Sequence, residues 1–190
     1  MDYVQFVEKI LQRIRLEDQE GEKRPQQALE KVKIGKVKTW IIEQAKDMGI
    51  DIEGYYHEVS NYFIRHVLKN HGDEKKEMSR GNLPINDRDF MQIPVILEYP
   101  DFVIVGAKRN NKDRIIYIKY MENGTMFYFE EILTGKNNKT LRANTMYKSR
   151  KKLNKAGIIA NIGMNKKTDT AKIKITGMDG GQPINTANQD

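Results

Sequence analysis

His66 and His71 are the side chains in this sequence whose type and spacing best suit proton transfer. Imidazole titrates near neutral pH, so two such rings can serve as a general base and a general acid. A zinc site is a weaker interpretation, because a five-residue separation on a helix turns roughly 500° and leaves the rings about 140° apart. The chain has no cysteine, so it lacks a thiol nucleophile and a cysteine-based metal site. We therefore predict acid–base chemistry without a metal ion or another cofactor.

The element expected to hold both histidines is an amphipathic helix from Asn61 to His71. Ser60 is a suitable N-cap, because its hydroxyl can accept a hydrogen bond from a free N–H of the first turn. Gly72 follows where a residue in the left-handed conformation commonly ends a helix. At about 100° per residue, one stripe of this helix gathers His71 with the apolar residues Phe63, Ile64, Val67 and Leu68.

The two histidines are expected at different positions around this helix. His71 lies on the apolar stripe, where the simplest interpretation is a hydrogen-bonded core or C-cap histidine favoured by the helix dipole. His66 lies at the edge of the stripe, beside Tyr62 and Asn70, where it can face a cleft or solvent. The spacing alone leaves a structural role and a catalytic role open for these rings.

The composition describes a polar, basic chain of 190 residues, with 38% hydrophobic residues, 31% charged residues and a net charge of +7. This length fits one domain with appendages. No apolar run approaches the ~20 residues of a membrane span, and the N-terminus lacks the layout of a secretory signal, so we expect a cytoplasmic protein. The positive charge favours polyanionic partners, with a merely solubilising surface as the alternative.

The residues before position 28 are expected to form a helix and a linker. Apolar side chains recur at intervals of three and four from Tyr3 to Ile14, as on one face of a helix. The stretch Glu17 to Gln27 contains Gly21 and Pro25 and is typical of a linker. Packing of this helix on the rest of the chain is the simpler expectation, and a docking or oligomerisation arm is the alternative.

Further helices are expected before the sheet. One runs from Val37 to Met48, and a short one begins at Asn86, whose side chain can cap it. The intervening stretch Asp73 to Ile85 is charged and contains glycine, which indicates a loop. Arg80 lies in this loop, where it could close over a phosphate.

Hydrophobicity alternates with a period of two after Asp101, which predicts antiparallel strands. Asn123 and Gly124 predict a two-residue type I′ hairpin. Three strands are expected in this region: Phe102 to Ala107, Arg114 to Tyr120 and Thr125 to Ile132.

A hairpin at that position gives the two strands one apolar face and one polar, aromatic face. Tyr120 would lie opposite Phe127 on the apolar face. The other face would pair Lys119 with Tyr128, and Tyr117 with Glu130. Such a surface is either an ordinary solvated face of a sheet or a platform for nucleotide stacking and phosphate contact, and the pattern favours neither.

The C-terminal part is expected to contain a strand from Leu141 to Thr145 and a basic helix from Met146 to Gly157. Lys148 lies early in this helix, where the helix dipole disfavours cations. A phosphate bound at the helix N-terminus would remove the conflict, and a screened surface helix is the alternative. After Ile158 only an edge strand from Ala171 to Thr176 is expected, followed by a flexible tail.

Several separated segments, in this order, resemble the phage-type members of the Barnase/EndoU/colicin/RelE-like (BECR) nuclease superfamily, which occur in phages and mobile elements. The resemblance covers roughly Ile34 to Leu153, and its specificity lies in the combination of motifs. The segments are IGKV, GIDIEGYYHEVSNYFIRHVLKNHG, RGNLPINDRDFMQIPVILEYPDFVIVG, IIYIKY, FYFEEI and LRANTMYK.

The resemblance implies an α+β fold in which N-terminal helices pack on a four-stranded antiparallel sheet. It also implies a metal-independent endoribonuclease that cleaves RNA by transesterification. In such enzymes a base activates the ribose 2′-OH, an acid protonates the leaving 5′ oxygen, and cationic or hydroxyl groups stabilise the phosphorane. A non-catalytic nucleic-acid or protein-binding module of a mobile element is the alternative function.

Carried onto this chain, the resemblance implies specific site residues. The expected catalytic residues are His66, His71, Lys119, Thr145 and Tyr147. The same resemblance implies Lys148 as a residue that binds the substrate. The pattern of the chain itself adds Arg80, Tyr117, Tyr128, Glu130 and Arg142 to the residues expected to bind it.

The expected organisation has three parts: residues 1–27 as helix and linker, residues 28–157 as the nuclease-like domain, and residues 158–190 as a poorly ordered extension. RNA is the expected partner. A toxin-like effector would also leave room for an immunity or antitoxin protein.

Overall fold

The computed structural model describes residues 1–20, 28–135, 138–164, 173–179 and 182–183. Within these ranges the chain is an α+β protein, and none of its helices is long and apolar enough to cross a membrane. The helices are α1 (Tyr3–Glu20), α2 (Thr39–Asp47), α3 (Asn61–His71), α4 (Glu74–Ser79), α5 (Asp87–Met91), α6 (Ile93–Glu98) and α7 (Lys155–Met164). The strands are β1 (Lys31–Lys36), β2 (Tyr56–Ser60), β3 (Asn82–Leu83), β4 (Phe102–Arg109), β5 (Lys112–Met121), β6 (Gly124–Leu133), β7 (Thr140–Ser149), β8 (Lys174–Asp179) and β9 (Gln182–Pro183).

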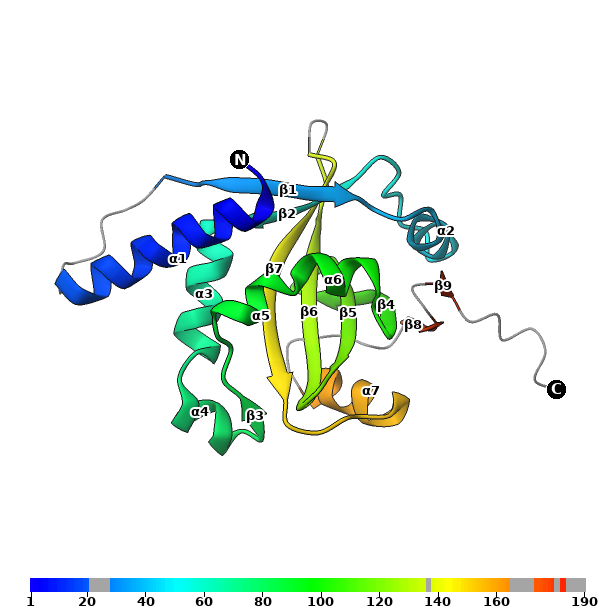
Figure 1. The fold of residues 1–190 in the computed structure, drawn as a ribbon. Coiled ribbons are helices and arrows are strands. Elements are labelled where there is room, and N and C mark those ends of the chain that lie inside the picture. Colours follow the sequence, from blue (N-terminus) through cyan, green and yellow to red (C-terminus); the bar gives the residue numbers. More distant parts are fainter. Residues whose placement is uncertain (21–27, 136–137, 165–172, 180–181, 184–190) are drawn as a thin grey trace.

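The described strands form a mixed sheet that is larger than the expected four-stranded antiparallel one. Its order is β1-β2-β7-β6-β5-β4-β8-β9, and β3 also pairs with β7. The antiparallel meander β4 to β7 lies at its centre (Figure 1). β2 extends it by pairing parallel to β7, and β8 pairs antiparallel to β4. The sequence did not predict β1 and β2, because β1 is short and interrupted by a register shift between Lys33 and Gly35, and β2 is buried along most of its length and does not alternate.

The predicted strands of the meander are confirmed, but the register between β5 and β6 differs from the expected one by two residues. Ile118 lies opposite Phe127, and Tyr120 lies opposite Thr125. A shift of two residues leaves each side chain on the same face of the sheet, so the division into two faces is retained.

The type I′ turn lies in the β4–β5 hairpin and not in the β5–β6 hairpin, where it was expected. Asn110 and Asn111, between β4 and β5, have φ of 51° and 60°, as that turn requires at both central positions. Gly124 instead begins β6, where a Cβ would lie 1.9 Å from the carbonyl oxygen of Ser149. This glycine is therefore required by the close approach of β7.

The predicted basic helix from Met146 is wrong, because this segment continues strand β7 to Ser149. Its backbone pairs with β6 from Thr125 opposite Ser149 to Phe129 opposite Thr145. Burial of Met146 and Tyr147 on opposite faces of the sheet outweighs the helical propensity of the lysine-rich run. The next helix, α7, begins at Lys155 and contains Gly157.

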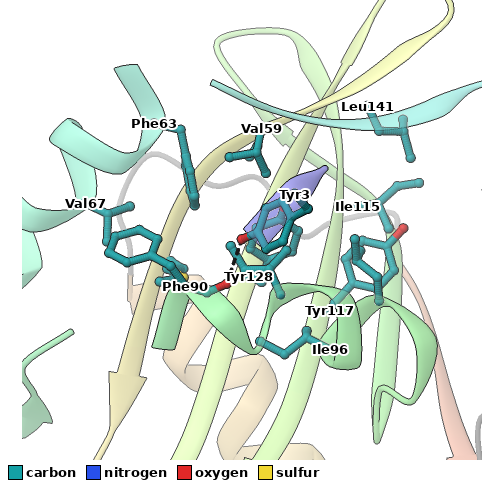
Figure 2. Packing of buried hydrophobic residues seen from close by; sticks show 14 of the residues in the cluster. Tyr3, Val59, Phe63, Val67, Phe90, Ile96, Ile115, Tyr117, Tyr128 and Leu141 are labelled. Atoms are coloured by element: carbon teal, nitrogen blue, oxygen red, sulfur yellow. Dashed lines mark hydrogen bonds between the residues drawn. The ribbon is translucent and has the colours of Figure 1, made fainter. Parts of the chain in front are cut away.

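One face of the sheet, here called the α1 face, is covered by helices and forms the main core. It carries Tyr117, Tyr128 and Met146, which pack against residues of α1, α2, α3, α5 and α6. Figure 2 shows Tyr128 beside Tyr3 of α1, whose hydroxyl donates to the carbonyl oxygen of Phe90 at 2.6 Å. Phe63 of α3 contacts both Phe90 and Tyr128 edge to face.

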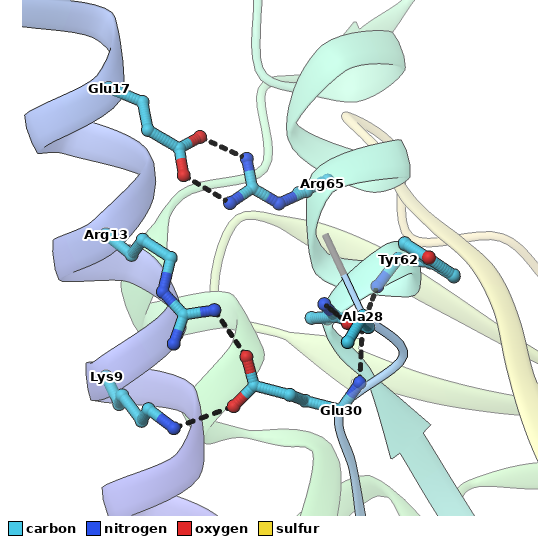
Figure 3. Close-up of polar contacts among 8 residues, drawn as sticks. Lys9, Arg13, Glu17, Ala28, Glu30, Tyr62 and Arg65 are labelled. Atoms are coloured by element: carbon cyan, nitrogen blue, oxygen red, sulfur yellow. Dashed lines mark hydrogen bonds and ion pairs between the residues drawn. The ribbon is translucent and has the colours of Figure 1, made fainter. Parts of the chain in front are cut away.

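Helix α1 packs on the rest of the chain, as its amphipathic pattern predicted, and extends to Glu20 into the expected linker. Lys9 and Arg13 both bind the carboxylate of Glu30, and Arg65 of α3 makes two hydrogen bonds to Glu17 (Figure 3). The remaining part of the expected linker, residues 21–27, lies outside the described residues.

The other face, here called the α7 face, is covered by α7 over only part of its area. Phe127, Phe129 and Tyr147 form a second cluster there with Ile158 and Ile162 of α7. On the neighbouring part of the same face, the alternation of β5 and β6 places Arg114 and Glu131, which lie opposite each other. This difference in cover separates a small apolar core from a polar surface.

Helix α3 has the predicted boundaries and the predicted N-cap. The hydroxyl of Ser60 accepts a hydrogen bond from the backbone N–H of Phe63 at 3.2 Å. Gly72 is not left-handed: its φ is −90°. A Cβ at this position would lie 2.5 Å from the carbonyl oxygen of Leu68, so the glycine is required by close packing.

The expected loop Asp73 to Ile85 contains helix α4 and strand β3. Asp73 caps α4 by accepting from the backbone N–H of Lys76 at 2.7 Å. The predicted helix from Val37 is confirmed as α2, and Asn86 caps α5 as predicted. The predicted edge strand Ala171 to Thr176 overlaps β8, although residues 171–172 lie outside the described part.

Candidate functional site

Helix α3 packs against β7. This packing brings the two histidines of α3 toward the α7 face of the sheet. In Figure 1 the helix lies beside β7, between β2 and the segment containing α4 and β3. The ring of His71 lies 5.9 Å from that of Tyr147 of β7. His66, five positions earlier, lines a separate pocket on the surface. The helix therefore places the two histidines along one strand of the sheet.

The pocket that contains His66 has a volume of about 250 Å³ and is strongly basic. It lies where α3, the β4–β5 hairpin and the first half of β7 meet. Its other lining residues are Arg109, Asn110, Lys112, Arg114, Glu131 and Asn144.

Arg114 is the most unusual residue of this pocket, because only 2% of it is exposed. Its Nη2 donates to Asn144 Oδ1 at 2.6 Å, whereas its Nε and Nη1 have no hydrogen-bond partner among the described residues. Burial lowers the pKa of Arg114 to about 10, and the nearby charge of Arg109 acts in the same direction. The guanidinium is still charged at neutral pH, and an anion in the pocket would satisfy its free donors.

Glu131 and Lys112 complete the charged lining of the pocket. Lys112 Nζ lies 2.6 Å from Glu131 Oε1, and 13% of the Glu131 side chain is exposed. Glu131 also lies directly opposite Arg114 in the sheet. The pocket therefore contains one carboxylate between two cations, and a carboxylate oxygen is a group that can accept a proton from a substrate hydroxyl.

His66 is the ionisable ring of this pocket. Partial burial lowers the pKa of His66, and the charges of His71, Arg109 and Lys69 lower it further. The amide of Asn70 donates to His66 Nδ1 at 3.2 Å, so the neutral ring carries its proton on Nε2. A bound phosphate would reverse the effect of the surrounding cations and favour the imidazolium.

His71 has a different environment, which matches the expected inward orientation. Its Nδ1 lies 3.1 Å from Oε2 of Glu77, a fully buried carboxylate that also accepts from Arg80 at 2.8 Å and Asn82 at 3.0 Å. Although burial alone raises the pKa of Glu77, the hydrogen bonds from His71 and Asn82 lower it overall. The Glu77 carboxylate can only accept, so it holds the His71 ring with a proton on Nδ1.

Thr145 and Tyr147 lie on β7 and are largely buried. Tyr147 stacks on Phe127 with ring centroids 4.9 Å apart, and its hydroxyl donates to Asn161 of α7 at 2.8 Å. Tyr147 therefore belongs to the second cluster, and its ring also contacts that of His71. These contacts leave its hydroxyl engaged with α7.

Lys119 does not lie with the histidines. It pairs with Asp101 at 3.4 Å and lies opposite Met126, whose side chain belongs to the core of the α1 face. Lys119 and Arg114 are five residues apart on one strand, so they lie about 17 Å apart along it, and their side chains point to opposite faces of the sheet. The structure therefore separates Lys119 from the basic pocket.

The expected aromatic surface is buried. Tyr117, Tyr128 and Glu130 are fully buried beneath the helices of the α1 face, where Tyr128 donates to Glu130 Oε1 at 3.1 Å. Glu130 Oε2 also lies 2.8 Å from Nδ1 of His57. Burial and the charge of Glu130 raise the pKa of both tyrosines well above its ordinary value. A nucleotide has no access to these rings, and the helices that exclude it could not be placed from strand alternation.

The three cations expected to position the nucleic-acid backbone lie apart from one another. Lys148 is buried and pairs with Asp89 at 2.8 Å, so the proposed phosphate site at a helix N-terminus does not form. Arg80 binds Glu77, and Arg142 lies 3.6 Å from Glu58 at the other end of β7.

The sequence pointed to His66 but not to the other residues of the pocket. Arg114 begins one predicted strand and Glu131 is the second-last residue of another, and alternation places both on one face with Ile116 and Phe129. Arg109 and Lys112 flank the pair Asn110-Asn111. Because asparagine tolerates positive φ, two consecutive asparagines indicate a two-residue hairpin turn. Asn144 enters through an irregularity between β6 and β7, which no pattern predicts.

Across the described residues, no group of three or more His, Cys, Asp and Glu side chains is arranged to hold a metal ion. No curated protein and no solved structure matches the chain significantly. Residues 35–156 match a family described as phage-Barnase-EndoU-ColicinE5/D-RelE like nuclease3. The matched region contains α3, the central meander and every lining residue of the basic pocket. The chain therefore belongs to this phage-type BECR nuclease family.

Proposed function

We propose that the protein is an endoribonuclease and that the scissile phosphate of RNA binds in the basic pocket beside Arg114. The observation that carries this proposal is a buried guanidinium with two free donors that shares a pocket with His66. Buried donors without a hydrogen-bond partner are costly, so a guanidinium of this kind suits a site that binds an anion. Guanidinium groups match the geometry of phosphate oxygens.

The reaction is a transesterification that uses the substrate's own hydroxyl. Glu131 accepts the proton of the 2′-OH, and the resulting oxygen forms a bond to phosphorus. The bond from phosphorus to the 5′ oxygen breaks, and His66 donates a proton to that leaving oxygen. The products are a 2′,3′-cyclic phosphate and a 5′-hydroxyl end, so no water is consumed in this step.

The charge of the phosphorane is stabilised by Arg114, Arg109 and Lys112, which line the same pocket. Their donors are held by the sheet and the hairpin before the substrate arrives, which is the arrangement that lowers a barrier most effectively. Because side-chain cations supply this stabilisation, the proposed reaction needs no metal ion.

His71 has a supporting role in this proposal. It lies beside Tyr147 and is held by Glu77, outside the lining of the basic pocket. Its charge contributes to the lowered pKa of His66, which links the two rings electrostatically. This assignment departs from a pair of histidines acting as base and acid.

The test compares cleavage of one RNA oligonucleotide by wild type and by the variants His66→Gln and Glu131→Gln. Each variant should lose about 10² to 10⁴ in kcat/KM, because each removes one proton-transfer group. His71→Gln is the matched control on the same helix and should retain activity within about tenfold. Circular dichroism and thermal unfolding would verify that each variant is folded.

The same assay distinguishes the chemistry. A substrate with 2′-deoxyribose at the cleaved position should bind but remain intact, and EDTA should leave the rate unchanged. An equal loss for His71→Gln would restore the two-histidine mechanism. Intact RNA under all conditions would favour a non-catalytic nucleic-acid-binding module.

A further inference from the structure

A row of charged residues crosses the sheet from the basic pocket to its outer edge. Cross-strand neighbours share one face of a sheet, so the row follows directly from the registers. Arg114 of β5 lies opposite Glu131 of β6, which lies opposite Arg142 of β7. Arg142 in turn lies opposite Glu58 of β2, which lies opposite Lys33 of β1.

The outer end of this row is exposed and positive. Lys31, Lys33 and Lys36 are the exposed residues of β1, and their register with β2 places them on the α7 face. Glu58 is almost fully buried, and it is neutralised by Lys31 at 2.9 Å and by Arg142 at 3.6 Å. The surface presented to solvent is therefore cationic.

An aromatic ring lies among these cations. Tyr56 of β2 shares their face, because it lies opposite Lys36 in the sheet. The Nζ atom of Lys33 lies 4.5 Å from the centroid of its ring, and that of Lys36 lies 5.9 Å away. A half-buried tyrosine beside lysines is the combination on which single-stranded nucleic acids stack and bind.

We propose that the surface formed by Lys31, Lys33, Lys36, Tyr56 and Arg142, here called the β1 strip, binds single-stranded RNA that extends beyond the scissile nucleotide. This inference rests on the proposed function, because the basic pocket fixes where the scissile phosphate lies. Four strand spacings separate β5 from β1, about 19 Å, so one chain of a few nucleotides can reach from the pocket to Tyr56.

The proposed contacts divide into two kinds. The lysines bind phosphates and contribute affinity that falls as salt rises, since each contact releases counterions. Tyr56 stacks on a base and contributes affinity that does not depend on salt. The substrate is therefore a single-stranded segment longer than a dinucleotide, without a strict sequence requirement at the strip.

The test measures binding of 2′-deoxy oligonucleotides of two and twelve nucleotides by fluorescence anisotropy at several salt concentrations. Wild type should bind the twelve-nucleotide strand more tightly. The double variant Lys33→Ala/Lys36→Ala should weaken that binding about tenfold and lower the salt slope by roughly 1.4, the value for two phosphate contacts on a single strand. Tyr56→Leu should weaken it about 5- to 100-fold with the slope unchanged.

Both strip variants should bind the two-nucleotide strand as wild type does, because that strand is too short to reach from the pocket to the strip. Lys75→Ala/Lys76→Ala is the matched control, because it removes the same charge from exposed positions on α4. The proposal would be overturned if the control lost as much affinity as the strip variants, or if both strip variants bound the twelve-nucleotide strand like wild type. An acidic surface of a partner protein would then be the better candidate to bind the β1 strip. Binding of deoxy strands does not require cleavage, so this result is independent of whether the chain cuts RNA.

Discussion

Arg114 and His66 show how a site depends on burial as well as on residue type. Arginine on a strand end is usually a surface residue, whereas Arg114 is buried with two donors free. Residue type alone predicts a catalytic role for the histidines, because imidazole is the usual group for proton transfer near neutral pH. The sequence could therefore identify His66 but not the buried cation that gives it a role.

The protonation of His66 provides a test at the scale of the residue. Partial burial and the charges of His71, Arg109 and Lys69 lower its pKa below the ordinary value of 6.5. A phosphate beside Arg114 adds negative charge, which favours the imidazolium and should raise the pKa again.

We expect the His66 resonances in an NMR titration to have a midpoint below pH 6.5 in the free protein, and a higher midpoint with saturating inorganic phosphate. The His57 resonances are the internal control, since that ring contacts Tyr117 on the α1 face, away from the pocket. If the His66 midpoint did not change at saturating phosphate, the anion would not bind in this pocket.

Tyr117 and Tyr128 show why alternation cannot distinguish a binding surface from a core. Both strands alternate as predicted, and the face that carries the tyrosines was identified as a unit. Which face the helices cover depends on the connections around β2 and α3, and strand periodicity carries no information about them.

At the scale of the element, helix α3 is the part of the site that the sequence predicted best. Its boundaries, its N-cap and its apolar stripe are local properties, and local patterns determine them. The strand β7 was predicted only to Thr145, because its second half is stabilised by pairing with β6, which is distant in sequence from it.

The end of α3 provides a second test. Gly72→Ala would place a Cβ 2.5 Å from the carbonyl oxygen of Leu68. We expect this overpacking to destabilise the protein by about 1 to 3 kcal/mol, measured by urea unfolding.

Gly163→Ala is the matched control, because a Cβ there meets nothing within 4 Å. It lies within α7, so alanine should raise stability by up to about 1 kcal/mol through its helix propensity. Equal stability of Gly72→Ala and wild type would mean that the glycine at this helix end is not required by packing.

At the scale of the whole molecule, the chain combines two sides with different tasks. The α1 face forms the large core, and helix α1 completes it through Phe6, Val7 and Ile10. The α7 face keeps its charged surface open beside a smaller apolar cluster. The proposed chemistry and the proposed β1 strip both lie on that second side, so packing and function do not compete for the same residues.

The contacts that hold α1 on the rest of the chain should make the stability of the protein depend on pH under acidic conditions. Hydrogen bonds from Arg13 and Lys9 lower the pKa of Glu30 to about 2, from an ordinary value of 4.5. A carboxylate whose pKa is depressed by folding contributes stability that is complete above pH 4.5 and is lost as the pH falls toward about 2. Glu30→Gln should therefore be less stable than wild type at pH 7 and should lose less stability between pH 5 and pH 2.5, measured by urea unfolding.

Glu53→Gln is the control, because Glu53 forms an exposed pair with Lys46 and exposed pairs contribute little. If both variants followed the wild-type pH dependence, the contacts of Glu30 would not be what holds α1 on the body of the protein, and its apolar face alone would have to do so.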